Sequence, residues 1–469
     1  MSIDKIKDEA ERFHQCFEYL ENQNIVIYGI GQLTKRLLNY GTTFHIVGLM
    51  DSDSSKIGTI IDGYPVISME TAEETADCII INTIEIYWAS IASKLSKCKM
   101  PVYYRNGQKM KVKGEGDYVF SLNDMYPRVI NKDDIVILKI IEEKIKDMKK
   151  VYTWEDFGFC ILGPIVYSYC CWLYSQTRDK YDCLFFLSRD GYLLHKDYDF
   201  FCKLLGLDVS EMHYIASGRR ITYVASVNDS KSYKEVLQDM YCGSFESFMK
   251  SRFDISVSRS DKHASSEIIL PRDIDILLQW IEPYKEMVSD EIRSERIEYQ
   301  SYLKKNIKEK KNIAVIDVGQ TGKIIWSLKS LLPDKMLHGY FFFANYSNDN
   351  PYRNCMDSCF HEPIKWRDCN IKRYLYLIEG VFTAPEGIAH KVVNGEVLYY
   401  ESKISFEKNI KINEGIKEFI LKVYEIDKGM VEVSPIFVDR LFGYMVQNAN
   451  ISNELMEKLE FEDVWTKTS

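Results

Sequence analysis

The chain has 469 residues, of which 46% are hydrophobic and 28% charged, the length and composition of two or three folded domains rather than of a disordered protein. A formal net charge of -9 leaves no basic excess to meet a phosphate backbone, which excludes bulk nucleic-acid binding. The twelve cysteines include no CxxC pair, so we expect reduced thiols in the cytoplasm rather than a disulfide framework or a zinc site. The first residues, 1–13, predict a charged helix without the apolar run of a secretory signal.

Residues 24–105 have the alternating strand and helix pattern of a Rossmann-like domain. Gly29 and Gly31 follow the first strand, and Asp51 ends the second strand roughly 20 residues later, where such folds place an acid on the ribose. The third glycine of the fingerprint is replaced by Thr34, so the motif is incomplete. The predicted strands are 24–28, 45–50, 76–82 and 101–104.

The segment 50–68, MDSDSSKIGTIIDGYPVIS, resembles the amino-terminal Rossmann-like domain of bacterial sugar-modifying proteins. These include acyltransferases and nucleotide-sugar enzymes of surface-polysaccharide pathways. The resemblance implies that Gly29, Gly31 and Asp51 bind a nucleotide or a nucleotide-sugar. The alternative is a Rossmann-like fold kept only for packing, because a fold does not fix a function.

A connector and a charged helix at 132–150 come next, and the helix has apolar positions at helical spacing that we expect to face a core. We place the domain boundary near residue 130. The stretch 157–174 contains no charged residue and is close to the lower length limit of a membrane span. Its glycines and proline, and flanks without a clear basic asymmetry, favour a buried helix beside the strand at 183–187. We therefore expect no transmembrane span.

The five apolar residues 183–187 have the pattern of a strand buried on both faces. Polar side chains at the carboxyl end of such a strand are where open α/β sheets hold ligands. Gly191 permits a tight turn there, which would point Ser188 and Asp190 into a crevice. The alternative is a buried strand that ends in an ordinary polar turn.

A second strand, 212–216, also ends in polar residues. Ser217 stands at its end, and Arg219 and Arg220 follow. Two adjacent guanidinium groups favour an anion site, because their forked donors match phosphate oxygens. The alternative is an N-capping serine followed by two surface arginines.

A third buried strand, 312–316, is followed by Asp317. The next residues include Gly319 and end in Lys323, at the expected start of a helix. A glycine-bearing loop between a strand and a helix, with a lysine at the helix start, predicts an anion cradle. The spacing of a P-loop is absent.

The strand end at Asp190 resembles the first motif of the haloacid dehalogenase-like (HAD-like) phosphotransferases, in which a strand ends in Asp-x-Asp-Gly. The resemblance implies that Asp190 is a general acid or base and a magnesium ligand, while Ser188 occupies the place of the nucleophilic Asp. Ser217 falls on the second motif, which hydrogen-bonds the phosphoryl group. Asp317 falls on the fourth motif as a second magnesium ligand, and Thr321 replaces the other acid of that motif.

The segments LSRDGYLL, ASGRR, IDVGQTGK and IEGVFTAPEG, the last at 378–387, occur in this order in a group of bacterial HAD-like proteins. Members of this group are found with, or fused to, glycosyltransferases of capsule and cell-wall polysaccharide synthesis. In this group an Arg-Asp-Gly motif replaces Asp-x-Asp. The resemblance also implies a helical cap at about 222–300 that closes over the site and selects substrate.

The predicted fold is α/β, with a Rossmann-like parallel sheet in residues 1–130 and a larger HAD-like domain in 131–469 that carries the cap and carboxyl-terminal helices. The predicted function is that of a magnesium-dependent HAD-like hydrolase or phosphotransferase acting on a sugar phosphate or nucleotide-sugar in bacterial surface-polysaccharide biosynthesis. The alternative is a catalytically inactive HAD-like protein that binds such a ligand and serves as a scaffold for a glycosyltransferase. The missing nucleophile leaves both open. We expect the protein in the cytoplasm, including the inner face of the membrane.

Overall fold

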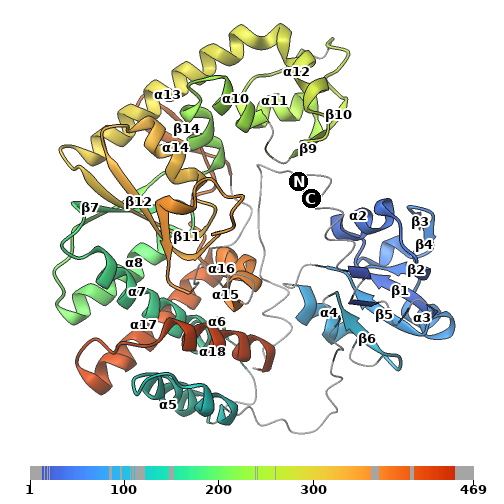
Figure 1. Ribbon diagram of the computed structural model, residues 1–469, viewed down its shortest axis with the longest axis horizontal. Coiled ribbons are helices and arrows are strands. Elements are labelled where there is room, and N and C mark those ends of the chain that lie inside the picture. The colour runs from blue at the N-terminus through green and yellow to red at the C-terminus, as the bar shows by residue number, and fades with distance from the viewer. Residues whose placement is uncertain are drawn as a thin grey trace. The chain divides into compact units, whose positions relative to one another are not determined.

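The computed structural model of this protein divides the chain into two compact units, Met1–Tyr118 and Val119–Ser469 (Figure 1). Each unit contains a parallel β-sheet and helices, which confirms the predicted α/β class. The helix predicted at 1–13 lies almost wholly outside the described residues. The structure describes residues 13–14, 16–17, 20, 22–83, 87–95, 98–105, 107, 110, 122–146, 151, 153–237, 239, 241–258, 260–360, 369–401 and 406–448.

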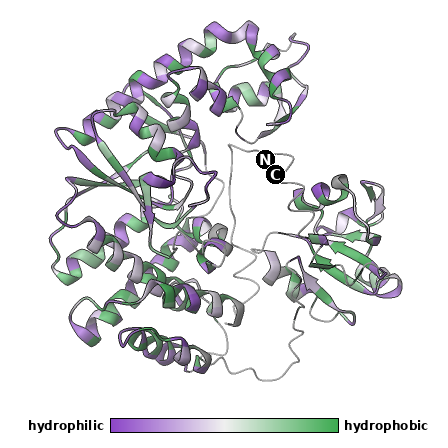
Figure 2. Ribbon diagram, viewed as in Figure 1, coloured by the Kyte–Doolittle hydropathy of each residue, from purple (hydrophilic) through white to green (hydrophobic). Residues whose placement is uncertain are grey.

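The amino-terminal unit is built on a four-stranded parallel sheet in the order β2-β1-β5-β6. Alternate residues of β1 enter two apolar clusters, Ile25 and Ile27 in one and Val26 and Tyr28 in the other, so both faces of the sheet are buried. In Figure 2 these strands are largely hydrophobic. The elements are β1 (Asn24–Tyr28), α2 (Gln32–Tyr40), β2 (His45–Met50), η2 (Ser54–Lys56), the hairpin β3 (Ile60–Ile61) and β4 (Tyr64–Pro65), α3 (Met69–Thr75), β5 (Cys78–Ile81), α4 (Trp88–Lys94) and β6 (Val102–Tyr104).

The second unit is built on a five-stranded parallel sheet in the order β13-β12-β11-β7-β8. The strands are β7 (Cys183–Leu187), β8 (Glu211–Ile215), β11 (Asn312–Gln320), β12 (Met336–Ala344) and β13 (Met356–Ser358). The chain moves outward from β7 to β8 and then returns to β11 on the other side of β7. The strand order therefore reverses between β7 and β11, and open α/β sheets bind ligands at the carboxyl ends of strands at such a point.

A continuous apolar helix covers part of this sheet. It comprises α6 (Trp154–Phe157), a π-helical segment η5 (Gly158–Leu162) and α7 (Gly163–Thr177). By length and composition it could cross a membrane, yet 89% of its most apolar window is buried inside the protein. The hydroxyl of Tyr169 donates a hydrogen bond of 2.7 Å to the carbonyl of Tyr340 on β12. The predicted burial of the helix at 157–174 is confirmed. It was expected beside β7, and the strand to which Tyr169 bonds is β12, on the far side of β11.

Close packing of two helices explains the glycines of this segment. Helix α17 (Glu407–Asp427) crosses η5 where Gly158 and Gly415 remove the side chains from the contact. A Cβ atom on Gly158 would lie 2.0 Å from the carbonyl oxygen of Ile412, and one on Gly415 would lie 1.9 Å from that of Glu155. The two backbones thus touch directly, which a lipid-exposed helix has no reason to require.

The residues between β8 and β11 form a subdomain with its own hydrophobic core. Its elements, in chain order, are α10 (Ser230–Leu237), β9 (Tyr241–Ser244), α11 (Phe245–Phe253), β10 (Glu267–Leu270), α12 (Ile274–Ile281) and η7 (Glu282–Tyr284). Strands β9 and β10 pair antiparallel although α11 lies between them in the chain, so this region, expected to be helical, also contains a two-stranded sheet. We call this subdomain, residues 227–284, the cap.

The long helix α13 (Lys285–Ile307) joins the cap to the sheet (Figure 1). Val288 and Ile292, in its first half, belong to the apolar core of the cap. Tyr299 and Leu303, in its second half, belong to the core beneath the five-stranded sheet. The helix therefore links two separate cores, and the residues between Ile292 and Tyr299 lie at their junction.

The remaining elements surround the sheet. The helix expected at 132–150 is α5, from Asp134 to Ile145, and residues 147–150 lie outside the described part. The others are η4 (Asn123–Arg128), α8 (Gly191–Leu205), η6 (Arg219–Tyr223), α9 (Val224–Ser226), α14 (Lys323–Leu331), η8 (Arg353–Cys355), α15 (Asn370–Arg373), α16 (Leu375–Val381), β14 (Ala389–Val393), β15 (Glu396–Tyr399) and α18 (Pro435–Asn448).

Candidate functional site

Two carboxyl groups meet at the carboxyl edge of the five-stranded sheet. Strands β7 and β11 are neighbours, with Phe186 opposite Ile316, so the residues after them lie at the same edge. Burial raises the pKa of Asp317 well above its usual value, and the negative charge of Asp190 raises it further. Asp190 and Asp317 both remain partly exposed to solvent. The structure thus brings together the two acids that the sequence proposed as magnesium ligands.

The environment of Asp190 is mixed in sign. Burial raises the pKa of its carboxyl group to about 6, although the guanidinium groups of Arg189 and Arg219 both lower it. Arg219 therefore lies close enough to Asp190 for its charge to act on that carboxyl group. Asp190 exchanges its proton near neutral pH, as a general acid or base must.

The glycine after Asp190 allows the helix to start close to the sheet. A Cβ atom at Gly191 would lie 2.8 Å from the carbonyl carbon of Phe186 and 3.1 Å from its Cβ. Helix α8 can therefore begin directly against β7 only without a side chain at this position. This close approach fixes Asp190, the residue before the helix, at the edge of the sheet.

The hydroxyl groups of Ser188 and Ser217 bond to each other's backbone. Ser188 Oγ donates to the Ser217 carbonyl at 3.0 Å and accepts from the Ser217 N–H at 3.0 Å, while Ser217 Oγ donates to the Ser188 carbonyl at 3.2 Å. These bonds hold the ends of β7 and β8 together. Each hydroxyl proton is already donated to a carbonyl oxygen, so attack by Ser188 or donation by Ser217 to a phosphate would require one of these bonds to break.

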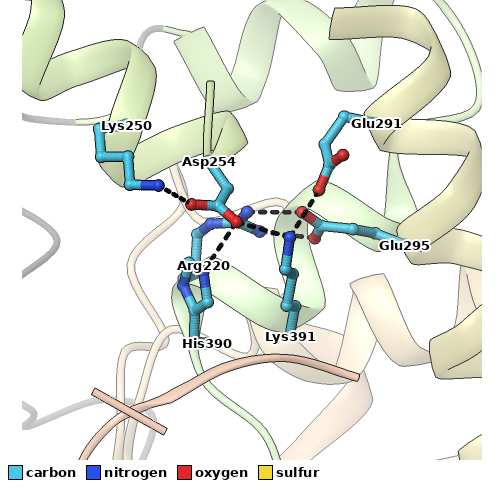
Figure 3. A network of polar contacts seen from close by, with 7 residues as sticks. All are labelled: Arg220, Lys250, Asp254, Glu291, Glu295, His390 and Lys391. Atoms are coloured by element: carbon cyan, nitrogen blue, oxygen red, sulfur yellow. Dashed lines mark hydrogen bonds and ion pairs between the residues drawn. The ribbon is translucent and has the colours of Figure 1, made fainter. Parts of the chain in front are cut away.

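The two adjacent arginines point to different places. Arg219 acts on Asp190 at the sheet edge. Arg220 instead forms a buried bidentate ion pair with Glu295 of α13, with distances of 2.6 and 2.5 Å (Figure 3). The predicted phosphate contact of Arg220 is not supported by this position, because both ends of its guanidinium fork are bonded to Glu295 and the side chain is 2% exposed.

The residues after β11 differ from the predicted anion cradle. Strand β11 continues to Gln320, so Gly319 lies in the strand and not in a loop. A Cβ atom there would lie 2.7 Å from the carbonyl oxygen of Phe343, which explains the glycine by strand packing. Lys323 lies at the helix start as expected, yet its Nζ is 3.5 Å from Asp239 Oδ1 of the cap and 4.4 Å from the ring centroid of Tyr223.

Two further acids reach this edge from the 378–387 segment. The negative charge of Glu379, on α16, raises the pKa of Asp317 further, after the larger effects of burial and Asp190. The charge of Glu386 acts on Tyr214 of β8, whose pKa is raised by burial and then by this acid. The sequence analysis identified this segment as a motif but did not single out Glu379. The available signal was that Glu379 is an acidic residue within the motif.

The donor set limits how a metal ion could be held. Among the residues that the structure describes, there is no group of three or more His, Cys, Asp or Glu side chains placed to share one ion. Magnesium commonly binds through one or two carboxylates and takes its other oxygens from water and substrate phosphate. Asp190 and Asp317 fit this arrangement, because a divalent cation would relieve the repulsion that raises the pKa of Asp317.

In the amino-terminal unit, hydrogen bonds of Thr34 hold the loop that contains the glycine motif. Gly29 has φ of 101°, and a Cβ atom on it would lie 2.2 Å from Thr83 Cγ2. The hydroxyl of Thr34, at the position of the missing third glycine, donates to the carbonyl of Gly29 at 2.5 Å and accepts from the amide of Asn82 at 3.1 Å. Thr34 thus ties the loop after β1 to the end of β5.

The predicted ribose acid is bonded to its own chain. Asp51 accepts hydrogen bonds from the N–H groups of Ile30 at 3.1 Å and Asp53 at 3.0 Å, and it pairs with Lys56 at 3.1 Å. Burial acts to raise the pKa of Asp51, but these partners outweigh burial and hold it below its usual value. Gly31, the N-cap of α2, has no side-chain cap and faces open space on its Cβ side.

Comparison with known proteins adds information on the first unit. A family model described as C2185-like, N-terminal, matches residues 21–103. This range contains β1, β2 and β5 and most of β6, so the similarity concerns the Rossmann-like unit. No curated protein matches the chain. The fold and the paired acids define the second unit as an α/β domain with a candidate ligand site at its strand ends.

Proposed function

We propose that the second unit binds the phosphate group of a sugar phosphate or nucleotide-sugar, together with Mg²⁺, at the carboxyl edge of β7 and β11. The observation that carries the proposal is the meeting of Asp190 and Asp317 at the ends of neighbouring strands, where burial raises the pKa of Asp317 and the charge of Asp190 raises it further. Arg219 beside them supplies a positive charge for the phosphate oxygens. The motif resemblance to HAD-like phosphotransferases supports the same assignment.

The favoured activity is phosphoryl hydrolysis or transfer in bacterial surface-polysaccharide biosynthesis, in the cytoplasm or at the inner membrane face. Bound Mg²⁺ would withdraw charge from the phosphate oxygens. Asp190, with a pKa of about 6, would accept the proton of an attacking water or sugar hydroxyl and return it to the leaving oxygen. This direct transfer fits better than a Ser188 intermediate, because the Ser188 proton is donated to the Ser217 carbonyl.

One observation favours the alternative, a catalytically inactive module that binds such a ligand and acts as a scaffold for a glycosyltransferase. Both departures from the HAD-like pattern have structural roles. Ser188 Oγ joins β7 to β8, and Thr321 Oγ1 accepts a hydrogen bond of 3.4 Å from the N–H of Lys323 at the start of α14. A residue that has lost a catalytic role commonly takes such a role in packing.

For the amino-terminal unit we propose binding of a nucleotide or nucleotide-sugar near Gly29, Gly31 and Asp51. The uncapped start of α2 offers backbone N–H donors to a phosphate. Asp51 is ionised, and its bonds to Ile30 and Lys56 keep it at the end of β2. The same bonds would also be expected if this unit were kept only for packing. Ligand binding by the amino-terminal unit is therefore tested separately from ligand binding by the second unit.

The test is calorimetric titration of the full chain with MgCl₂, alone and with a panel of hexose phosphates and nucleotide-sugars. We expect wild type to bind a phosphorylated ligand only with Mg²⁺, and Asp190→Asn or Asp317→Asn to weaken Mg²⁺ binding by roughly 100-fold. Asp199→Asn is the matched control, because this acid of the same helix α8 pairs with Lys203 at the surface at 2.7 Å.

Phosphate release measured on the ligands that bind then separates the two candidates. Turnover that is lost in Asp190→Asn supports the enzyme. Binding without turnover leaves the scaffold. Ligand binding that depends on neither Mg²⁺ nor Asp190 contradicts the enzyme and also leaves the scaffold.

A further inference from the structure

A network of seven polar residues lies where the cap, helix α13 and strand β14 meet (Figure 3). It contains three cations and three carboxylates, and the pKa of its histidine is lowered to about 4 by burial, with a further lowering by Arg220, so that side chain is neutral at pH 7. The charges therefore balance within the network. Its members are Arg220, Lys250, Asp254, Glu291, Glu295, His390 and Lys391.

The cap enters this network through Asp254, the C-cap of α11. Its carboxylate pairs with Lys391 Nζ at 2.5 Å, with Lys250 of its own helix, and with His390 Nε2 at 3.5 Å. Lys391 also pairs with Glu291 of α13 at 3.1 Å. Docking of the cap on β14 thus leaves Asp254 with three partners, two of them from outside the cap.

The buried end of the network is the pair between Arg220 and Glu295, which are 2% and 4% exposed. Glu295 lies one turn after Glu291 on α13, at the junction of the two apolar cores. A buried bidentate pair holds its partners in a narrow range of positions, because displacing either leaves an unpaired charge away from water. Arg220 is therefore fixed relative to α13.

Arg220 and Arg219 are consecutive residues of the single turn η6. Whatever holds the backbone at Arg220 also sets where the side chain of Arg219 begins. Arg219 follows Ser217, whose N–H donates to Ser188 Oγ at the end of β7 at 3.0 Å, while Arg220 is held by Glu295 of α13. The turn is thus placed between the network and the sheet edge.

We propose that Arg220 is a positioning residue for Arg219, and that the network makes the placement of Arg219 depend on docking of the cap. This inference rests on the proposed phosphate site. The pairs of Lys391 with Asp254 and Glu291 keep the cap and α13 on β14, the pair of Arg220 with Glu295 keeps η6 against α13, and Arg219 then faces the phosphate. A ligand held by Arg219 would in turn favour the docked cap.

The test is a double-mutant cycle on the full chain, with the affinity for inorganic phosphate in the presence of MgCl₂ measured by calorimetry. We expect Arg219→Ala to weaken phosphate binding by roughly 30-fold and Arg220→Lys, which keeps the charge and loses the fork, by roughly 10-fold. In the Arg219→Ala background, Arg220→Lys should have no further effect, because it acts through Arg219.

The cap side is tested by Asp254→Asn, for which we expect a weakening of roughly threefold that also vanishes in the Arg219→Ala background. The matched control is Arg272→Lys, since Arg272 forms a similar forked pair with Asp273 but on the exposed surface of the cap. Thermal unfolding and circular dichroism check that each variant folds, and Asp254→Asn carries the test if Arg220→Lys does not.

Additive losses in the cycle, or an unchanged affinity in both Arg220→Lys and Asp254→Asn, would overturn the positioning role and leave the proposed phosphate site intact. An unchanged affinity in Arg219→Ala would overturn the phosphate contact of Arg219 and this inference with it. The two failures are therefore distinguishable.

Discussion

The two parallel sheets of this protein place acids at their carboxyl edges in opposite electrostatic states. In the amino-terminal unit, Asp51 accepts two backbone hydrogen bonds and pairs with Lys56, and its pKa is lowered. In the second unit, Asp317 lies beside Asp190 and its pKa is raised. Asp51 is held in its charged form by partners on its own chain, whereas burial and a second acid favour the protonated form of Asp317. Similar topology thus supports opposite preferences for the charged form at the two sheet edges.

A raised pKa alone does not mark a ligand site, because burial by packing raises it as well as a neighbouring acid does. Asp197 is an example of burial alone. This acid of α8 is fully buried, its pKa is raised to about 7 by burial, and its one hydrogen bond comes from Asn413 at 2.5 Å. Its environment is closed by packing, unlike that of Asp190. Since the folded state favours the protonated form, this residue stabilises the fold less as the pH rises.

The largest expected effect follows from Asp197. Between the unfolded pKa near 4 and the folded pKa of about 7, the folded protein holds the proton more tightly, so its contribution is complete below pH 4 and is lost as the pH rises to 7. The loss amounts to roughly 4 kcal/mol. Asp197→Asn cannot ionise and should lack this share of the pH dependence. About 3 kcal/mol of this loss falls between pH 5 and pH 8, where denaturant unfolding measures it. An equal pH dependence in wild type and variant would contradict the prediction.

The next prediction tests whether Thr34 holds the loop after β1 in the amino-terminal unit. Thr34→Gly would complete the GxGxxG spacing but would remove the hydroxyl that bonds Gly29 and Asn82. We expect a loss of about 2 kcal/mol, because a buried amide loses its partner and a helix gains a glycine. Thr34→Ser retains the hydroxyl and serves as the control. Thermal unfolding with equal losses in both variants would show that the hydrogen bonds are unimportant.

The smallest expected effects compare Asp51 and Asp317 directly, and the two changes in stability should have opposite signs. Asp51→Asn removes the ion pair with Lys56 and should destabilise the protein by about 1 kcal/mol. Asp317→Asn removes the repulsion with Asp190 and should stabilise the metal-free protein by about 1 kcal/mol. Unfolding in EDTA at pH 7.5 measures both. A destabilising Asp317→Asn would mean that the chain itself already balances this charge.

Much of the local structure was determined by the sequence alone. The apolar run 183–187 is a fully buried strand, and the uncharged stretch 157–174 is a buried helix, because the length and polarity of such runs fix which elements they form. The positions of the acids at strand ends could likewise be predicted. Gly191 was expected to permit a turn, and it does so by letting α8 start against Phe186.

Tertiary structure decided which of these residues meet. Pairing of β7 with β11, more than a hundred residues apart in sequence, brings Asp190 to Asp317, and no local spacing encodes this contact. Arg219 and Arg220 look equivalent in the sequence, yet Glu295 of a distant helix takes one and leaves the other to the sheet edge. Lys323 is drawn to Asp239 of the cap in the same way. Side-chain direction at these positions depends on partners that arrive only when the chain packs, so the sequence supplied the groups and the fold assigned their roles.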